Sequence, residues 1–143
     1  MFVAGRGRPD FVLEAKQLNH AKSYQRAGNY IGAEAMKRFL SGDYAAYTAR
    51  FPEVGMVGYV LSDSVGAWRD RLKAAIKDKG PTLAPRRPQQ DIRVVADFPL
   101  EWTSGHDRQS TSRPVMIYHI FASFMDTDKG EPYDSVAPAA AHP

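Results

Sequence analysis

The stretch Arg8-Pro-Asp-Phe-Val-Leu-Glu-Ala-Lys16 decides the fold expected for this chain of 143 residues. Successive side chains of an extended strand point to opposite faces, so every second residue shares a face. One face would carry Asp10, Val12, Glu14 and Lys16, and the face toward the core would carry Phe11, Leu13 and Ala15. Two carboxylates and an amine therefore meet on one side of the expected strand.

This grouping suits a metal site. Mg²⁺ is a hard cation that proteins hold through one or two carboxylates while it keeps several waters. Asp10 and Glu14 could hold such an ion, and Lys16 could orient or deprotonate one of its waters. The alternative is a polar edge strand in which Glu14 and Lys16 form a solvated pair of small energetic value. Because three-residue motifs arise often by chance, the remaining sequence has to decide between these interpretations.

The stretch resembles the Pro-Asp … (Asp/Glu)-x-Lys signature of the PD-(D/E)xK nuclease superfamily, with Glu14-Ala15-Lys16 at the Glu-x-Lys element. In that superfamily the first acidic residue usually lies on a preceding strand, a role that falls to Asp10 here. Later residues are similar to those of bacterial members: Tyr30, Arg38-Phe39, Gly42-Asp43-Tyr44, Gly58-Tyr59-Val60, Ser104-Gly-His106-Asp-Arg108 and His119-Ile-Phe121. The resemblance covers about residues 8–124 and implies a restriction-endonuclease-like fold that is shortened at its N-terminus.

The resemblance implies a Mg²⁺- or Mn²⁺-dependent endonuclease that cleaves nucleic acid, DNA above all, in a defence or mobile-element system. Asp10 and Glu14 would hold the metal, and Lys16 would position the attacking water. Contacts to phosphate would come from Arg38, His106 and Arg108. A rival from another class is a catalytically inactive module of the same fold that binds nucleic acid or a protein partner. A homo-oligomer or a partner protein could then complete the core. A third interpretation is a small α/β domain with no role in nucleic-acid binding.

Length and composition limit the class of protein. One domain over residues 1–125 is expected, followed by a disordered Asp-rich and Pro/Ala-rich tail over residues 126–143. Cysteine is absent from the sequence, which excludes disulfides and thiolate-ligated metals. The chain has no apolar run of membrane-span length, and its N-terminus is unlike a signal peptide, so we expect a cytoplasmic protein without a membrane partner.

The charge distribution favours a polyanionic partner without requiring one. The net charge is +3, and basic residues recur in pairs. These pairs are Arg6 and Arg8, Lys22 and Arg26, Lys37 and Arg38, and Arg86 and Arg87. A solvated surface explains any single pair, whereas several pairs around an acidic strand suit a phosphate backbone. His119 lies within an apolar run and is expected to be a hydrogen-bonded core histidine.

The expected elements give an α/β fold with a central mixed sheet flanked by helices. Helices are expected over 30–40 with Asn29 as N-cap, over 44–50, and from a cap at Ser62 or Asp63 to about residue 80. Strands are expected over 54–61, 92–97, 100–104 and 115–124, and a mobile basic loop over 81–90. The order strand, helix, buried strand predicts a right-handed parallel crossover.

Overall fold

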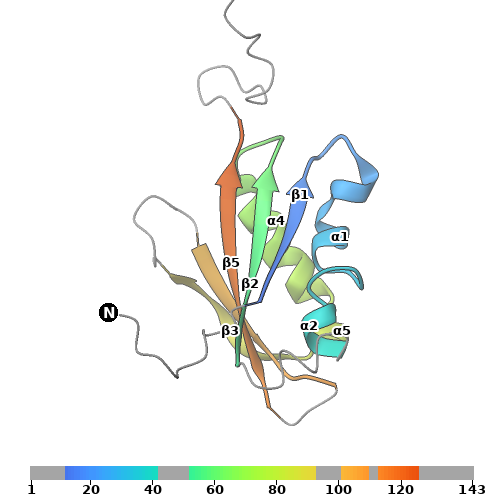
Figure 1. Cartoon of the computed structure of the whole chain (residues 1–143), viewed down its shortest axis with the longest axis vertical. Coiled ribbons are helices and arrows are strands. Elements are labelled where there is room, and N and C mark those ends of the chain that lie inside the picture. Colours follow the sequence, from blue (N-terminus) through green and yellow to red (C-terminus); the bar gives the residue numbers. More distant parts are fainter. Residues whose placement is uncertain (1–11, 42–51, 93–100, 110–112, 126–143) are drawn as a thin grey trace, which may run out of the picture.

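A five-stranded mixed sheet organises the computed structural model, which describes residues 12–41, 52–92, 101–109 and 113–125. Its strands are β1 (Leu13–Leu18), β2 (Glu53–Val60), β3 (Pro85–Ile92), β4 (Glu101–His106) and β5 (Val115–Ser123), in the order β1-β2-β5-β4-β3. Strands β1, β2 and β5 run parallel, and their arrows point to the same end in Figure 1. Strands β4 and β3 are antiparallel additions. The predicted α/β class with a mixed sheet is confirmed, as is the parallel pairing of the first two strands.

The longest helix of the described residues is α4 (Val65–Asp78), which crosses behind the parallel strands in Figure 1. It begins at Ser64, whose hydroxyl accepts a hydrogen bond from the Ala67 N–H at 3.1 Å, so the N-cap is neither Ser62 nor Asp63. Its buried stripe consists of Trp68, Leu72 and Ile76. None of the helices in the described residues has the length and apolar character needed to span a bilayer.

The hydrophobic core lies between α4 and one face of the sheet. Parallel register places Leu18 beside Val60, and Gly58 beside Phe121, so the same face of each strand turns toward the helices. The buried strand residues of this face include Leu18, Val54, Met56, Val60, Trp102, Val115, Ile117 and Phe121. Continuous apolar strands of this kind are typical of parallel sheets covered by helices.

The helix predicted over 30–40 is wrong as one continuous element. The chain forms a 3-10 turn η1 (Ser23–Gln25), then α1 (Ala27–Tyr30) and α2 (Arg38–Ser41). Between the two helices the Met36 N–H donates to the Tyr30 carbonyl at 3.2 Å, which is not an α-helical bond. The apolar residues of the predicted stripe are nevertheless buried: Ile31, Ala35, Met36, Phe39 and Leu40. The periodicity therefore predicted which residues are buried, but not the conformation of the backbone.

The mobile loop predicted over 81–90 is also wrong, because this segment forms α5 (Gly80–Leu83) and β3. Strand β3 lies at an edge of the described sheet, and its pairing with β4 shifts between Pro85 and Arg87 and again before Gln90. An edge position and irregular pairing both tolerate proline, which cannot donate to a ladder. The predicted helix over 44–50, residues 93–97 of a predicted strand and the tail over 126–143 lie outside the described residues.

The faces of β1 are opposite to the prediction. Leu13 is 55% exposed and Ala15 is exposed, whereas Glu14 and Lys16 lie half-buried on the helix-covered face. The phase is set by Leu18, which is fully buried beside Val60 on that same face. The predicted period of two was correct, but its phase was wrong, so the two faces of the strand are exchanged.

Gly58 allows β2 to pack against its neighbours. A Cβ at this position would stand 2.6 Å from Leu18 Cδ1 and 2.7 Å from Phe121 Cδ1. We expect Gly58→Ala to lower the free energy of unfolding by about 1–3 kcal/mol, because the core must shift to admit a methyl group. Urea unfolding will measure the loss. Gly28→Ala is the matched control, since a Cβ there would meet nothing within 4 Å; equal losses in both variants would contradict this explanation.

Candidate functional site

Glu14 and Lys16 form an ion pair on β1, with Lys16 Nζ 3.0 Å from Glu14 Oε1. Their side chains are 18% and 29% exposed, respectively. Each pairs in register with a residue of β2, Glu14 with Met56 and Lys16 with Gly58, so both lie on the helix-covered face. The predicted shared face of Glu14 and Lys16 is therefore confirmed, and their position at the edge strand leaves both partly accessible. Asp10 lies outside the described residues, so its membership of this group stays a prediction.

The donor set at β1 provides one carboxylate for a metal. Glu14 is the acidic residue of this strand, and its carboxylate already contacts the Lys16 ammonium. In the part of the chain that the structure describes, no three His, Cys, Asp or Glu residues gather where they could hold an ion. Mg²⁺ is often bound by one or two carboxylates with water completing its octahedron. Glu14 fits that mode of binding, with Asp10 as the predicted second ligand.

Two of the predicted phosphate-binding residues lie on neighbouring segments. Arg38, on α2, is 35% exposed and pairs with Glu34 at 2.6 Å. Arg108 follows β4 and is 7% exposed, and its burial lowers the pKa of the guanidinium. The next residue, Gln109, donates its N–H to the Leu40 carbonyl at 2.9 Å, which brings this segment against α2. This hydrogen bond places the segment that carries Arg108 next to the helix that carries Arg38.

The third predicted phosphate ligand, His106, belongs to a buried chain of hydrogen bonds that we call the Tyr30–Leu83 relay. Its successive contacts are Tyr30 Oη to His119 Nδ1 (3.1 Å), His119 Nε2 to Ser104 Oγ (2.8 Å), Ser104 Oγ to His106 Nε2 (2.8 Å) and His106 Nδ1 to the Leu83 carbonyl (2.7 Å). All four side chains are at most 1% exposed. The relay joins α1, β5, β4 and α5 inside the molecule.

The Leu83 carbonyl fixes the direction of every hydrogen bond in the relay. A carbonyl can only accept, so His106 donates from Nδ1 and accepts at Nε2 from the Ser104 hydroxyl. Ser104 Oγ then accepts from His119 Nε2, which leaves the lone pair of His119 Nδ1 facing the Tyr30 hydroxyl, whose one proton is shared with the Met56 carbonyl at 3.3 Å. Each neutral ring therefore has one tautomer, and each ring nitrogen has a partner.

Burial keeps the relay uncharged. It lowers the pKa of His106, although the Leu83 carbonyl and Asp107 act in the opposite direction. It lowers the pKa of His119 well below the usual value, and the nearby His106 adds to this effect. His119 also stacks on Trp102, with ring centroids 4.4 Å apart. The prediction that His119 is a hydrogen-bonded core histidine is confirmed, whereas His106 has no exposed atom here to meet a phosphate.

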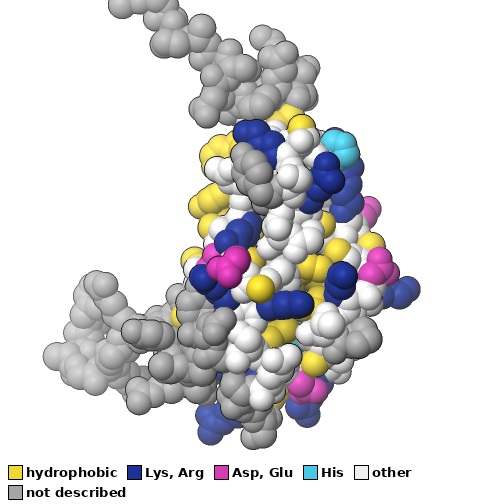
Figure 2. Space-filling view, turned by 90° about the vertical axis from the view of Figure 1, so that its right-hand side faces the viewer, with side chains coloured by type: hydrophobic (Ala, Val, Ile, Leu, Met, Phe, Trp, Pro, Cys, Tyr) yellow, Lys and Arg dark blue, Asp and Glu magenta, His cyan; other side chains and the backbone are white. Residues whose placement is uncertain are grey.

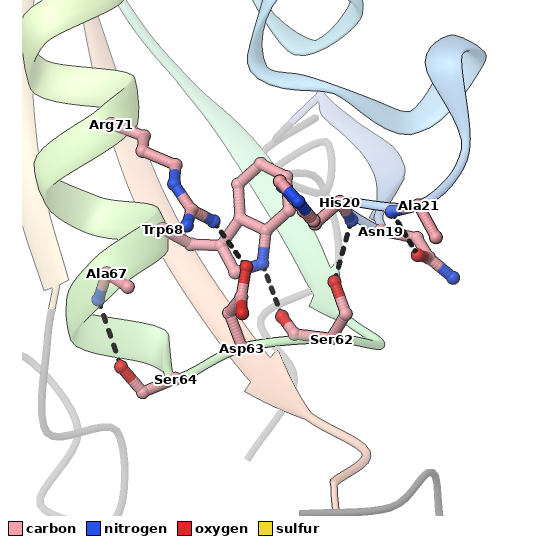
Figure 3. Close-up of polar contacts among 9 residues, drawn as sticks. All are labelled: Asn19, His20, Ala21, Ser62, Asp63, Ser64, Ala67, Trp68 and Arg71. Carbon is pink, nitrogen blue, oxygen red and sulfur yellow. Dashed lines mark hydrogen bonds and ion pairs between the residues drawn. The ribbon is translucent and has the colours of Figure 1, made fainter.

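A second polar cluster, absent from the sequence-based expectations, lies beyond the carboxyl ends of β1 and β2 (Figure 3). The His20 N–H donates to Ser62 Oγ at 2.7 Å, and Trp68 Nε1 donates to the Ser62 carbonyl at 2.5 Å. Arg71 pairs with Asp63 at 2.6 Å and lies over the Trp68 ring. Open α/β sheets bind ligands beyond the carboxyl ends of their strands, so this end of the sheet is a natural place for a binding surface.

The cations of the surface are spread out. Figure 2 shows Lys and Arg side chains over the whole height of one side, with acidic groups between them. Arg86 pairs with Asp107 at 3.2 Å, and Arg87 runs across Gly105, where a Cβ would stand 3.2 Å from the Arg87 Cβ. Several modest basic areas, rather than one continuous patch, would therefore face a polyanion on this side.

The chain matches no protein-family model, no curated protein and no solved structure. Among the polar groups described above, the Glu14–Lys16 pair has the clearest chemical use.

Proposed function

We propose that the chain is a metal-dependent nuclease that hydrolyses phosphodiester bonds of DNA. The observation that carries this proposal is the close Glu14–Lys16 pair on one face of β1, the strand that opens a parallel crossover. A carboxylate and an amine 3.0 Å apart can serve one metal-bound water together. The mixed sheet supports a restriction-endonuclease-like core, which is part of the proposal.

The residues divide the chemistry between them. Glu14, with Asp10, would hold Mg²⁺ or Mn²⁺. Such an ion polarises a phosphoryl oxygen and lowers the pKa of a bound water. Lys16 would orient the attacking water and stabilise the negative charge that grows on the phosphoryl group. Arg38 would bind an adjacent phosphate from α2, and Arg108 would support that surface from the neighbouring segment. His106 would act at a distance, by keeping β4 and α5 together through the relay.

The second candidate is a catalytically inactive module of the same fold that binds nucleic acid or a protein partner. Restricted access to Glu14 favours it, because this side chain is 18% exposed and lies on the helix-covered face of β1. The β2 residues in register with Glu14 and Lys16 are Met56 and Gly58, which bring no second carboxylate. In this candidate the same surface would bind its partner without hydrolysis.

Cleavage assays with the purified chain separate the two candidates. We expect Mg²⁺ or Mn²⁺ to support cleavage of DNA, and EDTA to abolish it, because the metal supplies the activated water. Linear, circular and single-stranded DNA and RNA should all be tested with each metal. Absence of cleavage on every form would contradict the nuclease. Salt-dependent binding without cleavage would then support a nucleic-acid-binding module, and absence of binding to nucleic acid would leave only a module that binds a protein partner.

A further inference from the structure

A hollow of about 260 Å³ opens near the carboxyl ends of the parallel strands, lined by Gln17, Tyr59, Leu61 and Phe124. Gln17 and Tyr59 are register partners and project from the sheet face that lacks the core residues. Phe124 reaches the same place because its N–H donates to the Val60 carbonyl at 3.0 Å. The hollow is thus built from β1, β2 and the residue that follows β5.

Two aromatic rings give this hollow an accessible apolar surface. Tyr59 is 37% exposed and Phe124 is 44% exposed, although large aromatic side chains are usually well buried. Their ring centroids are 5.5 Å apart and the planes meet at 73°. In this edge-to-face arrangement the two rings are not stacked in parallel on each other. A planar ligand could therefore stack in the hollow.

The Gln17 amide borders the hollow on the β1 side. Gln25 Nε2 donates to Gln17 Oε1, which fixes the Gln17 side chain. Gln25 is 6% exposed, and its own Oε1 has no hydrogen-bond partner among the described residues. Gln25 thus supports the Gln17 side chain from behind, and the Gln17 amide can donate to the edge of a heterocyclic ring.

Two cations flank Gln25 on the same segment. Lys22 and Arg26 are exposed, and neither forms an ion pair within the described part of the chain. The segment is fixed beside the end of β1, because the Asn19 N–H donates to the Gln25 carbonyl at 3.1 Å and the Gln25 N–H donates to the Lys22 carbonyl at 3.0 Å. An aromatic hollow lined by one amide, with two unpaired cations on the segment next to the end of β1, complements a base and its adjoining phosphates in charge.

We propose that this hollow binds one unpaired nucleobase of a single-stranded nucleic acid, with Lys22 and Arg26 contacting the adjoining phosphates. Its volume lies below the ~300–1,000 Å³ of pockets for drug-sized ligands, so it suits a single ring system. Aromatic stacking combined with a cationic border is how proteins hold single strands without reading their sequence. The inference rests on the proposed function, and it narrows the substrate to nucleic acid with unpaired bases.

The test compares binding to a single-stranded 12-mer and a blunt duplex by fluorescence anisotropy in EDTA. Tyr59→Ala and Phe124→Ala should each weaken single-strand binding by about 5- to 150-fold, the usual effect of losing a base stack. Duplex affinity should not change, because its bases are paired. Tyr59→Phe and Phe124→Tyr should bind normally. Leu13→Ala is the matched control, as it removes an exposed apolar side chain outside the hollow.

The cations have a separate readout. Replacing both Lys22 and Arg26 by Ala should reduce the slope of log affinity against log salt by about 0.7 for each lost phosphate contact to a single strand. Replacing Lys77 and Lys79, two basic residues at the far end of α4, provides the control. An unchanged slope in the Lys22 and Arg26 double variant would overturn their assignment to phosphate.

Each remaining outcome distinguishes this inference from the proposed function. Normal single-strand binding by folded Tyr59→Ala and Phe124→Ala overturns the inference, whereas metal-dependent cleavage by the wild-type chain would still stand. A change from dimer to monomer in these variants, with single-strand affinity unchanged, assigns the rings to a second copy of the chain and also overturns it. A wild-type chain that binds no nucleic acid overturns both proposals.

Discussion

Replacing Glu14 by Gln should lower the rate of metal-dependent cleavage by about 100-fold or more. The amide keeps the shape of the side chain but loses the charge that would hold the cation. Lys16→Met should have an effect of similar size, because it keeps the apolar stem and removes the ammonium group. Both side chains are partly exposed at an edge strand, so the melting temperature should stay within a few degrees. Initial cleavage rates and thermal melts of the same preparations will measure the two effects.

Two other ion pairs of the chain provide matched controls. Glu34→Gln makes the same chemical change in the pair with Arg38, and Lys73→Met does so in the pair with Asp91. Neither control should reduce cleavage by more than a few-fold. If Glu14→Gln cleaves as fast as Glu34→Gln, the pair on β1 is a structural contact and the nuclease needs another centre.

Lowering the pH from 7 to 5.5 should reduce the free energy of unfolding by up to about 2.5 kcal/mol. The cause is the neutral state of His106 and His119, whose pKa values are both lowered by burial. Below pH 6.5, the pKa of an unfolded histidine, the unfolded chain binds protons that the folded chain does not bind. Each histidine therefore lowers the free energy of unfolding by up to ~1.36 kcal/mol per pH unit. The loss begins as the pH falls through about 6.5 and ends at the folded pKa values. Urea unfolding at several pH values will measure it.

Single variants test which histidines cause the acid sensitivity. His119→Gln should remove about half of the pH dependence, even if the variant is less stable at every pH. His20→Asn should leave the dependence unchanged, because His20 is exposed at the end of β1. Stability that stays constant or rises on acidification would show that the relay is charged or open in solution.

The longest apolar patterns predicted the fold best. Strand β2 and helix α4 each combine a continuous or periodic apolar run with clear boundaries, and both lie where the sequence placed them. The pattern over 30–40 has the same periodicity, but Gly32 brings the backbone so close to the Gly28 carbonyl that a Cβ would stand 2.8 Å away. A chain that turns this tightly buries the predicted residues without a continuous helix. Tertiary packing decided the backbone there.

The candidate site was predictable where its geometry is local. Glu14 and Lys16 share a face because they are two residues apart on a strand, which needs no knowledge of the remaining fold. His106 was not predictable in this way, since its partner Leu83 is 23 residues away and reaches it only after α5 has formed. The strand was expected to end at Ser104, with His106 beyond it, whereas β4 continues to His106 and buries both side chains. The hollow at Tyr59 needs Phe124, which follows a third strand, β5.

The central place of β5 affects how the chain is synthesised. Strand β5 is the last strand of the described residues, yet it lies between β2 and β4 and joins the two parts of the sheet. While the ribosome is still adding residues before Val115, the β1–β2 pair and the β3–β4 pair have no strand to link them. At that stage β5 does not yet cover the apolar side chains of Val54, Met56 and Trp102. The nascent chain thus depends on its final fifth for a closed core, which makes this interval the time when it is most open to aggregation or to binding by a chaperone.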